Sequence, residues 1–151
     1  MPSVLDRLLD DDPTSSGEKP MTLAKLGSAL RDAVRRDLED LLNTRRRPFP
    51  LPAGLDELEN SSFEYGIPDF SGANLTSAER RRRYLKGIEE IIRRHEPRLT
   101  AVRVLPIDER TPHFRTLHFR IEAVLRAEPA PESVLYDSHV DLLTRSFRIQ
   151  G

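Results

Sequence analysis

The chain has 151 residues, of which 37% are hydrophobic and 32% charged, and its 24 basic and 25 acidic side chains leave a net charge of -1. This length and composition are typical of one globular domain that buries most of its apolar surface. The near-neutral total argues against a protein whose main partner is nucleic acid. The lack of cysteine excludes disulfides and thiolate metal sites and is consistent with a reducing compartment.

Membrane and export signals are not apparent in the sequence. No apolar run approaches the roughly 20 residues that a membrane-spanning helix needs. The acidic N-terminal region lacks the basic and apolar parts of a signal peptide. We therefore expect a cytoplasmic protein that is not embedded in a membrane.

The first 20 residues are predicted to form a docking segment and a linker, ahead of a single domain over residues 21–151. Residues 3–9 (SVLDRLL) form a short amphipathic turn with three leucines on one side. Residues 10–20 contain no aliphatic or aromatic side chain and are typical of a linker. A tethered apolar element of this kind docks either on its own domain or on a partner, and the sequence leaves both alternatives open.

Two amphipathic helices are predicted. The first covers residues 22–42, where leucine and valine recur at steps of three and four and make one apolar stripe. The second begins at a capping-box pattern over residues 76–79 and ends at Glu96, because Pro97 disfavours a helical residue before it. The connection over residues 43–75 is rich in proline and in apolar residues, so we expect it to pack across the surface of the domain.

The C-terminal part alternates apolar and polar residues, which is the pattern of half-buried strands. Strands are predicted around residues 100–104, 114–126 and 134–142, and over 145–150 after a tight turn near Thr144-Arg145. Two helices followed by a run of strands predict an α+β fold, with two amphipathic helices packed on a small, mainly antiparallel sheet of about four strands.

Candidates for catalysis and metal binding are scarce. The sequence has no nucleophile elbow, phosphate-binding loop or zinc-protease motif. His113 and His118 are five residues apart in an extended run and point to opposite faces, while His95 and His139 each stand alone. No two carboxylates can be placed across a groove, as glycoside hydrolysis would need. We therefore predict no catalytic residue, no metal site and no cofactor.

Two basic runs, at residues 45–47 and 80–83, offer another kind of site. They could contact phosphates, or they could be solvated faces whose arginines pair with nearby acids. Since the runs lack interleaved aromatic residues, we favour solvated faces and predict no nucleic-acid partner.

The segment Glu96-Pro97-Arg98 joins the second helix to the first strand. Because proline fixes φ near -65°, the flanking acid and base would be presented rigidly, with little entropy left to lose on binding. The segment could be an exposed charged handle for a partner, and the residues alone leave this open. The alternative is an internal helix stop, in which Glu96 and Arg98 pair with charges of this chain.

Several segments together resemble one family, the TssE wedge subunits of the bacterial type VI secretion baseplate, and the related phage T4 wedge protein whose family is often labelled lysozyme-like. The resemblance covers nearly the whole chain. It rests on SVLDRLL (3–9), VRRDLEDLLNTRRR (34–47), YGIPDFSG (65–72), HEPRL (95–99) and LYDSHVDLLTRSFRI (135–149).

The resemblance implies a structural, non-enzymatic baseplate component that links wedge subunits (TssF, TssG and TssK) to the contractile sheath and supports sheath assembly. It implies that Glu96, Pro97 and Arg98 contact the wedge core bundle, and that the sheet accepts strands from sheath subunits. The alternative function, a peptidoglycan-cleaving muramidase, comes only from the family label. Relatives commonly have Thr-Gly where this chain has Thr144-Arg145. If that turn requires positive φ, arginine there costs about 1 kcal/mol.

The last predicted strand is a candidate edge of the sheet, with Phe147 and Ile149 as apolar anchors and Arg148 between them. An edge strand exposes main-chain groups that a partner strand can use. We predict that this hairpin, or the strand at the other margin, receives sheath segments, with the Arg148 N–H as an outward donor. In the alternative, the proline-rich connection covers both margins.

Overall fold

Two long helices and a four-stranded sheet make up most of the described chain. The protein is represented by a computed structural model that describes residues 23–49, 54–59, 61–68, 75, 77–107, 116–128 and 130–151. The helical elements are α2 (Leu23–Asn43), α3 (Asp56–Glu59), the 3-10 helix η1 (Ser62–Glu64) and α4 (Ala78–His95). The strands are β1 (Leu99–Pro106), β2 (Thr116–Leu125), β3 (Glu132–Asp141) and β4 (Ser146–Gln150). The predicted α+β fold is confirmed, while the predicted N-terminal segment lies outside the described residues.

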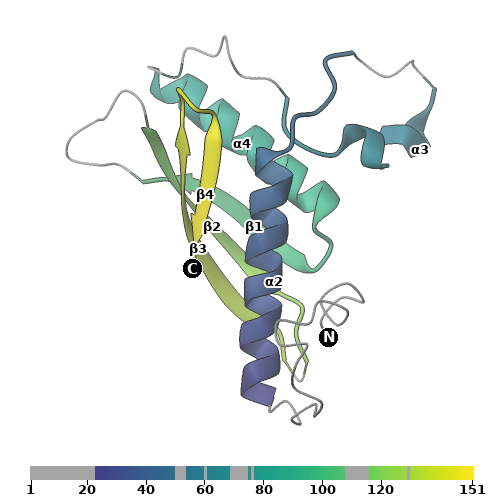
Figure 1. Ribbon diagram of the computed structural model, residues 1–151, viewed down its shortest axis with the longest axis vertical. Coiled ribbons are helices and arrows are strands. Elements are labelled where there is room, and N and C mark those ends of the chain that lie inside the picture. Colours follow the sequence, from purple (N-terminus) through teal and green to yellow (C-terminus); the bar gives the residue numbers. More distant parts are fainter. Residues whose placement is uncertain are drawn as a thin grey trace, which may run out of the picture.

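The sheet is a meander in which each strand pairs antiparallel with the next, in the order β1-β2-β3-β4. Strands β2 and β3 are ten residues long and pair along their whole length. β1 and β4 are therefore the two edges of the sheet. Figure 1 shows α2 running along the sheet beside β4. Helix α4 crosses near the C-terminal end of α2, and α3 lies apart from both helices.

Strand β1 is longer than predicted, because a β-bulge shifts its alternation of buried and exposed residues by one position. The register against β2 shifts between Thr100 and Arg103, and Ala101 has a φ of 50°. The extra residue changes the phase of the strand, so Leu99 and Val102 both face the core although they are three residues apart. A strict two-residue period therefore links Val102 with Val104 but does not include Leu99.

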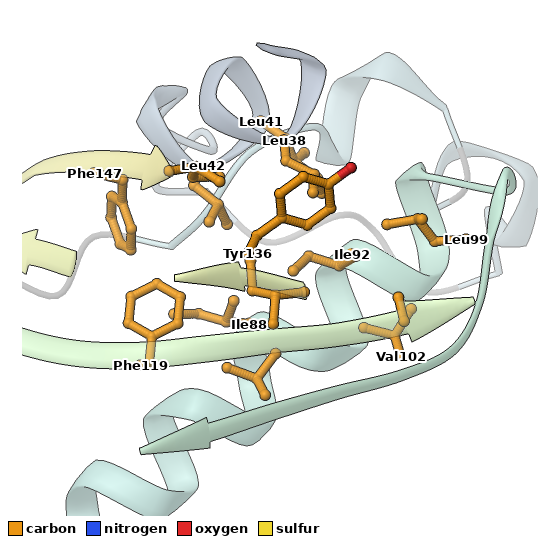
Figure 2. Close-up of a cluster of buried hydrophobic side chains, with 14 of the residues drawn as sticks. Leu38, Leu41, Leu42, Ile88, Ile92, Leu99, Val102, Phe119, Tyr136 and Phe147 are labelled. Carbon is orange, nitrogen blue, oxygen red and sulfur yellow. The ribbon is translucent and has the colours of Figure 1, made fainter. Parts of the chain in front are cut away.

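The core lies between one face of the sheet and the two long helices. The predicted apolar face of β2 is confirmed, since alternate residues from Leu117 to Leu125 are buried. Figure 2 shows side chains of α2, α4 and the four strands meeting in one cluster. Phe119 and Phe147 contact each other edge to face, with ring centroids 6.2 Å apart. Both helices cover the same face, and no described helix covers the other, where Leu135 and Arg148 are exposed.

Helix α4 ends where the sequence predicts and begins within the predicted start over residues 76–79, with Ser77 as its cap. The Ser77 side chain accepts a hydrogen bond from the Arg80 N–H and caps the first turn. At the other end the Glu96 N–H still donates to the Ile92 carbonyl, at 2.9 Å, and Pro97 stops the helix. Within the described part of the chain, no helix is both long enough and apolar enough to cross a bilayer.

The connection between the helices packs on the domain only in part. Ile67 and Leu75 are buried, as predicted, but Phe49 and Phe63 are exposed. The described chain passes so close to α2 at Gly66 that a Cβ there would lie 2.5 Å from the Thr44 carbonyl oxygen, and the residue has a φ of 101°. Glycine is therefore required at this point.

The last turn has the conformation that disfavours arginine. Arg145 has a φ of 59°, and its N–H donates to the Asp141 carbonyl at 2.7 Å. The turn thus requires positive φ, the condition under which an L-residue other than glycine is strained.

Candidate partner-binding site

The Glu96-Pro97-Arg98 segment lies at the surface, but its charges point inward. Glu96 is only 5% exposed, so the prediction of an exposed acid is wrong. Arg98 Nε lies 2.6 Å from Glu96 Oε1, and Arg98 Nη2 lies 2.5 Å from Glu96 Oε2. The same Nη2 lies 2.5 Å from Asp37 Oδ2 on α2. Burying a lone carboxylate is costly, so the guanidinium folds back onto it.

This charge cluster (Asp37, Glu96 and Arg98) ties the helix–strand junction to α2. The hydrogen bond to Glu96, and then that to Asp37, raise the pKa of the Arg98 guanidinium above its usual value despite its burial. Two carboxylates against one guanidinium leave the cluster with a net charge of -1. Its side chains remain partly accessible, 25% for Arg98 and 38% for Asp37, and Pro97 is exposed beside them.

The outer edge of β4 is covered by a side-chain amide. Asn43, the last residue of α2, accepts from the Phe147 N–H at 2.9 Å and donates to the Phe147 carbonyl at 3.0 Å. An amide side chain thereby makes both bonds that a neighbouring strand would make. Arg35 adds a longer contact, 3.4 Å, to the Ile149 carbonyl.

The main-chain groups of Arg148 do not lie at this edge. In an antiparallel ladder the N–H and C=O of one residue point to the same side, and successive residues alternate. Since both groups of Phe147 point to Asn43, those of Arg148 point to β3, where Arg148 is paired with His139. The prediction of an outward Arg148 N–H is therefore wrong. Phe147 and Ile149 are buried anchors, as predicted.

The opposite edge, β1, is covered by an ion pair of α4. Arg93 donates to the Val102 carbonyl at 2.7 Å, and Glu89 accepts from the Val104 N–H at 3.0 Å. The two side chains also pair with each other at 2.7 Å. Side chains of α2 and α4 thus bind both edges of the sheet. The alternative from the sequence was that the proline-rich connection covers them.

The open face of the sheet brings together residues that the sequence could not pair. His118 and His139 stack with ring centroids 5.4 Å apart, and Arg120 pairs with Asp137 at 2.6 Å between Nε and Oδ1. Both pairs are direct cross-strand neighbours of β2 and β3. Finding them requires the register of the sheet, which residue spacing within one strand does not contain.

One arginine of each basic run pairs with an acid of the chain, as predicted. Arg46 lies 2.8 Å from Glu64, and Arg83 lies 3.1 Å from Glu79. Arg47 stacks over the Phe63 ring, with its Cζ 5.6 Å from the centroid. Among the residues that the structure describes, no group of three or more His, Cys, Asp or Glu side chains could hold a metal ion.

The chain was compared with protein families and with curated proteins. The family model of the baseplate wedge protein gp25 matches residues 28–130, from α2 to the turn after β2. A search of curated proteins found no match. The family match covers well over half of the chain and includes the Glu96-Pro97-Arg98 segment. This chain belongs to the family of the baseplate wedge protein gp25.

Proposed function

We propose that the protein is a cytoplasmic component of a type VI secretion baseplate, where it links wedge subunits to the contractile sheath and supports sheath assembly. The family match over residues 28–130 is the observation that carries this proposal. The proposed partners are the wedge subunits TssF, TssG and TssK, together with sheath subunits. The role is structural, with no catalytic step.

The proposed wedge contact is centred on Pro97. It is exposed, and the cluster next to it, in which Arg98 is hydrogen-bonded to both Glu96 and Asp37, has a net negative charge. A surface of this kind favours a cationic partner residue that contacts the accessible side of Asp37. Glu96 acts by holding Arg98 in place, because its own carboxylate is buried.

The proposed sheath contact is the β4 edge, with Phe147, Arg148 and Ile149 at its centre. An incoming strand would replace the Asn43 amide at the Phe147 N–H and C=O with its own peptide group. This exchange costs less than opening β1, where charged groups bind Val102 and Val104. Arg148 would face the incoming strand from the open face of the sheet.

Sheath assembly on baseplates with and without this chain tests the proposal. Baseplates that contain the chain should nucleate sheath polymerisation, and baseplates without it should not. Baseplates that contain the Asn43→Ala variant in place of the wild-type chain should also nucleate the sheath, because the variant lacks the amide that covers Phe147. Normal sheath polymerisation in the absence of the chain would contradict the linking role.

The muramidase function predicts a different result. Purified protein would clear a suspension of peptidoglycan, and substitution of one particular Glu or Asp would abolish the clearance. We expect no clearance at protein concentrations at which lysozyme is active. Clearance that depends on one carboxylate would replace the structural role with an enzymatic one.

A further inference from the structure

An apolar groove of about 340 Å³ lies between α4 and the connection that precedes it. Its apolar lining comes from both parts of the chain: Ile67, Pro68 and Leu75 from the connection and Tyr84, Ile88 and Ile91 from α4. Of these, Ile67, Leu75 and Ile88 also belong to the buried core. Arg80 and Arg83, both exposed, complete its lining at the start of the helix. The groove is thus apolar inside and cationic at one end.

Gly87 forms part of this groove and has no local reason to be glycine. It lies in the interior of α4, where glycine costs about 0.5–1 kcal/mol relative to alanine. Its φ is not positive, and a Cβ placed on it would meet no atom of the described residues within 4 Å. The missing side chain widens the groove, which is useful only if something enters it.

The charges at the start of α4 also favour an occupant of a particular kind. Cations in the first turns of a helix oppose the helix dipole. Arg83 pairs with Glu79, but both side chains are about four-fifths exposed, at 79% and 81%, so this pair contributes little. A negatively charged segment at the groove would relieve this local repulsion.

We propose that residues 3–12 of the same chain, SVLDRLLDDD, dock in this groove. The segment places Leu5, Leu8 and Leu9 on one side of a helical turn, which suits an apolar wall. Four aspartates against one arginine give it a net charge of -3, opposite to that of the Arg80 and Arg83 end. This inference does not depend on the proposed baseplate function.

The tether is long enough for this contact. α2 has 21 residues, so at 1.5 Å per residue it spans about 31 Å. Just beyond its end, Arg45 pairs with Ile67, which lines the groove. The segment therefore has to travel roughly the length of α2. Residues 10–22 can span at most about 43–47 Å when extended, which exceeds that length.

Disulfide trapping tests the contact, because the chain has no cysteine of its own. The full-length variant Leu9→Cys with Gly87→Cys should form an intramolecular disulfide under mild oxidation. The matched control pairs Leu9→Cys with Lys86→Cys, the exposed residue next to Gly87 that does not line the groove. We expect the Gly87 pair to close about tenfold faster than the control or more. Equal rates for both pairs, or only intermolecular disulfides, would overturn the proposal.

A second measurement does not require disulfide geometry. Because the chain contains no tryptophan, Leu8→Trp supplies a single fluorescence reporter in the segment. Its emission should lie at shorter wavelength than that of an exposed indole, and adding Arg80→Glu and Arg83→Glu should return it to the exposed value. Emission at the exposed wavelength in the Leu8→Trp protein itself would contradict docking.

Discussion

The carboxamide of Asn43 lies against both outward main-chain groups of Phe147, its Oδ1 2.9 Å from the N–H and its Nδ2 3.0 Å from the carbonyl oxygen. The same Nδ2 lies 2.9 Å from the Glu39 carbonyl, so one side chain links the end of α2 to the sheet edge. An edge strand left uncovered is free to pair with other chains. Asn43 therefore covers the outward main-chain groups of Phe147 at the β4 edge.

Replacing Asn43 with alanine should uncover this edge. We expect a loss of about 1–2 kcal/mol in the free energy of unfolding, because two main-chain groups lose their partner. Hydrogen exchange of the Phe147 amide should accelerate, while that of Val104, at the other edge, should not change. Protection of the Phe147 amide that is equal in both proteins would mean that Asn43 does not cover it.

Replacing Arg98 with alanine should destabilise the isolated protein. The change leaves the Glu96 carboxylate buried without its cation, and we expect a cost of about 2–3 kcal/mol. The expected cost is below the ~3–5 kcal/mol of a fully buried pair because Arg98 remains partly accessible.

A matched double variant, Arg98→Ala with Glu96→Gln, separates charge from packing. It removes the unpaired charge and should recover part of the lost stability in urea unfolding. Stability of Arg98→Ala within error of the wild type would show that the cluster is not an internal support.

Arg145→Gly should stabilise the last turn. Glycine adopts a φ of 59° without the strain that arginine incurs, and we expect a gain of up to about 1 kcal/mol. Arg145→Ala is the control, because it removes the same side chain but keeps the strain. The measurement is the melting temperature of the glycine variant relative to that of the alanine variant. A glycine variant that melts no higher than the alanine variant would argue against strain at this residue.

Stability should depend on pH through His95. Burial, reinforced by Arg94, lowers the pKa of His95, although a hydrogen bond to the Glu64 main chain opposes the shift. A base with a lowered folded-state pKa binds more protons when unfolded, so its contribution is present above the unfolded value of about 6.5 and is lost as the pH falls below it. His95→Gln should flatten the curve of unfolding free energy between pH 7 and 5. Parallel curves for the two proteins would rule out His95 as the titrating group.

Much of the fold could be predicted because it depends on local patterns. The alternation from Leu117 to Leu125 and the cap at Ser77 are properties of short stretches, and the structure has both. The bulge at Ala101 could not be predicted, since it shifts the phase of β1 without any turn residue to mark it.

The candidate site was harder to predict, because its contacts join distant parts of the chain. Pro97 marks the junction in the sequence, but the partner of Arg98 on α2, Asp37, is 61 residues away. Asn43 and Phe147 are 104 residues apart, and no local pattern relates them. The local sequence therefore suggests an exposed handle at Glu96, whereas tertiary packing buries this carboxylate.

Co-purification with wedge subunits is the measurement that tests the account most directly. The tagged chain, co-expressed with TssF and TssG from the same organism, should elute with both as one complex in size-exclusion chromatography. Pro97→Lys should weaken that complex, because it places a cation opposite the cationic partner residue, while leaving the circular dichroism and melting temperature of the isolated chain close to the wild type, since Pro97 is exposed. A folded wild-type chain that elutes alone, in the presence of both subunits, would contradict the proposed role as a wedge component of a type VI secretion baseplate.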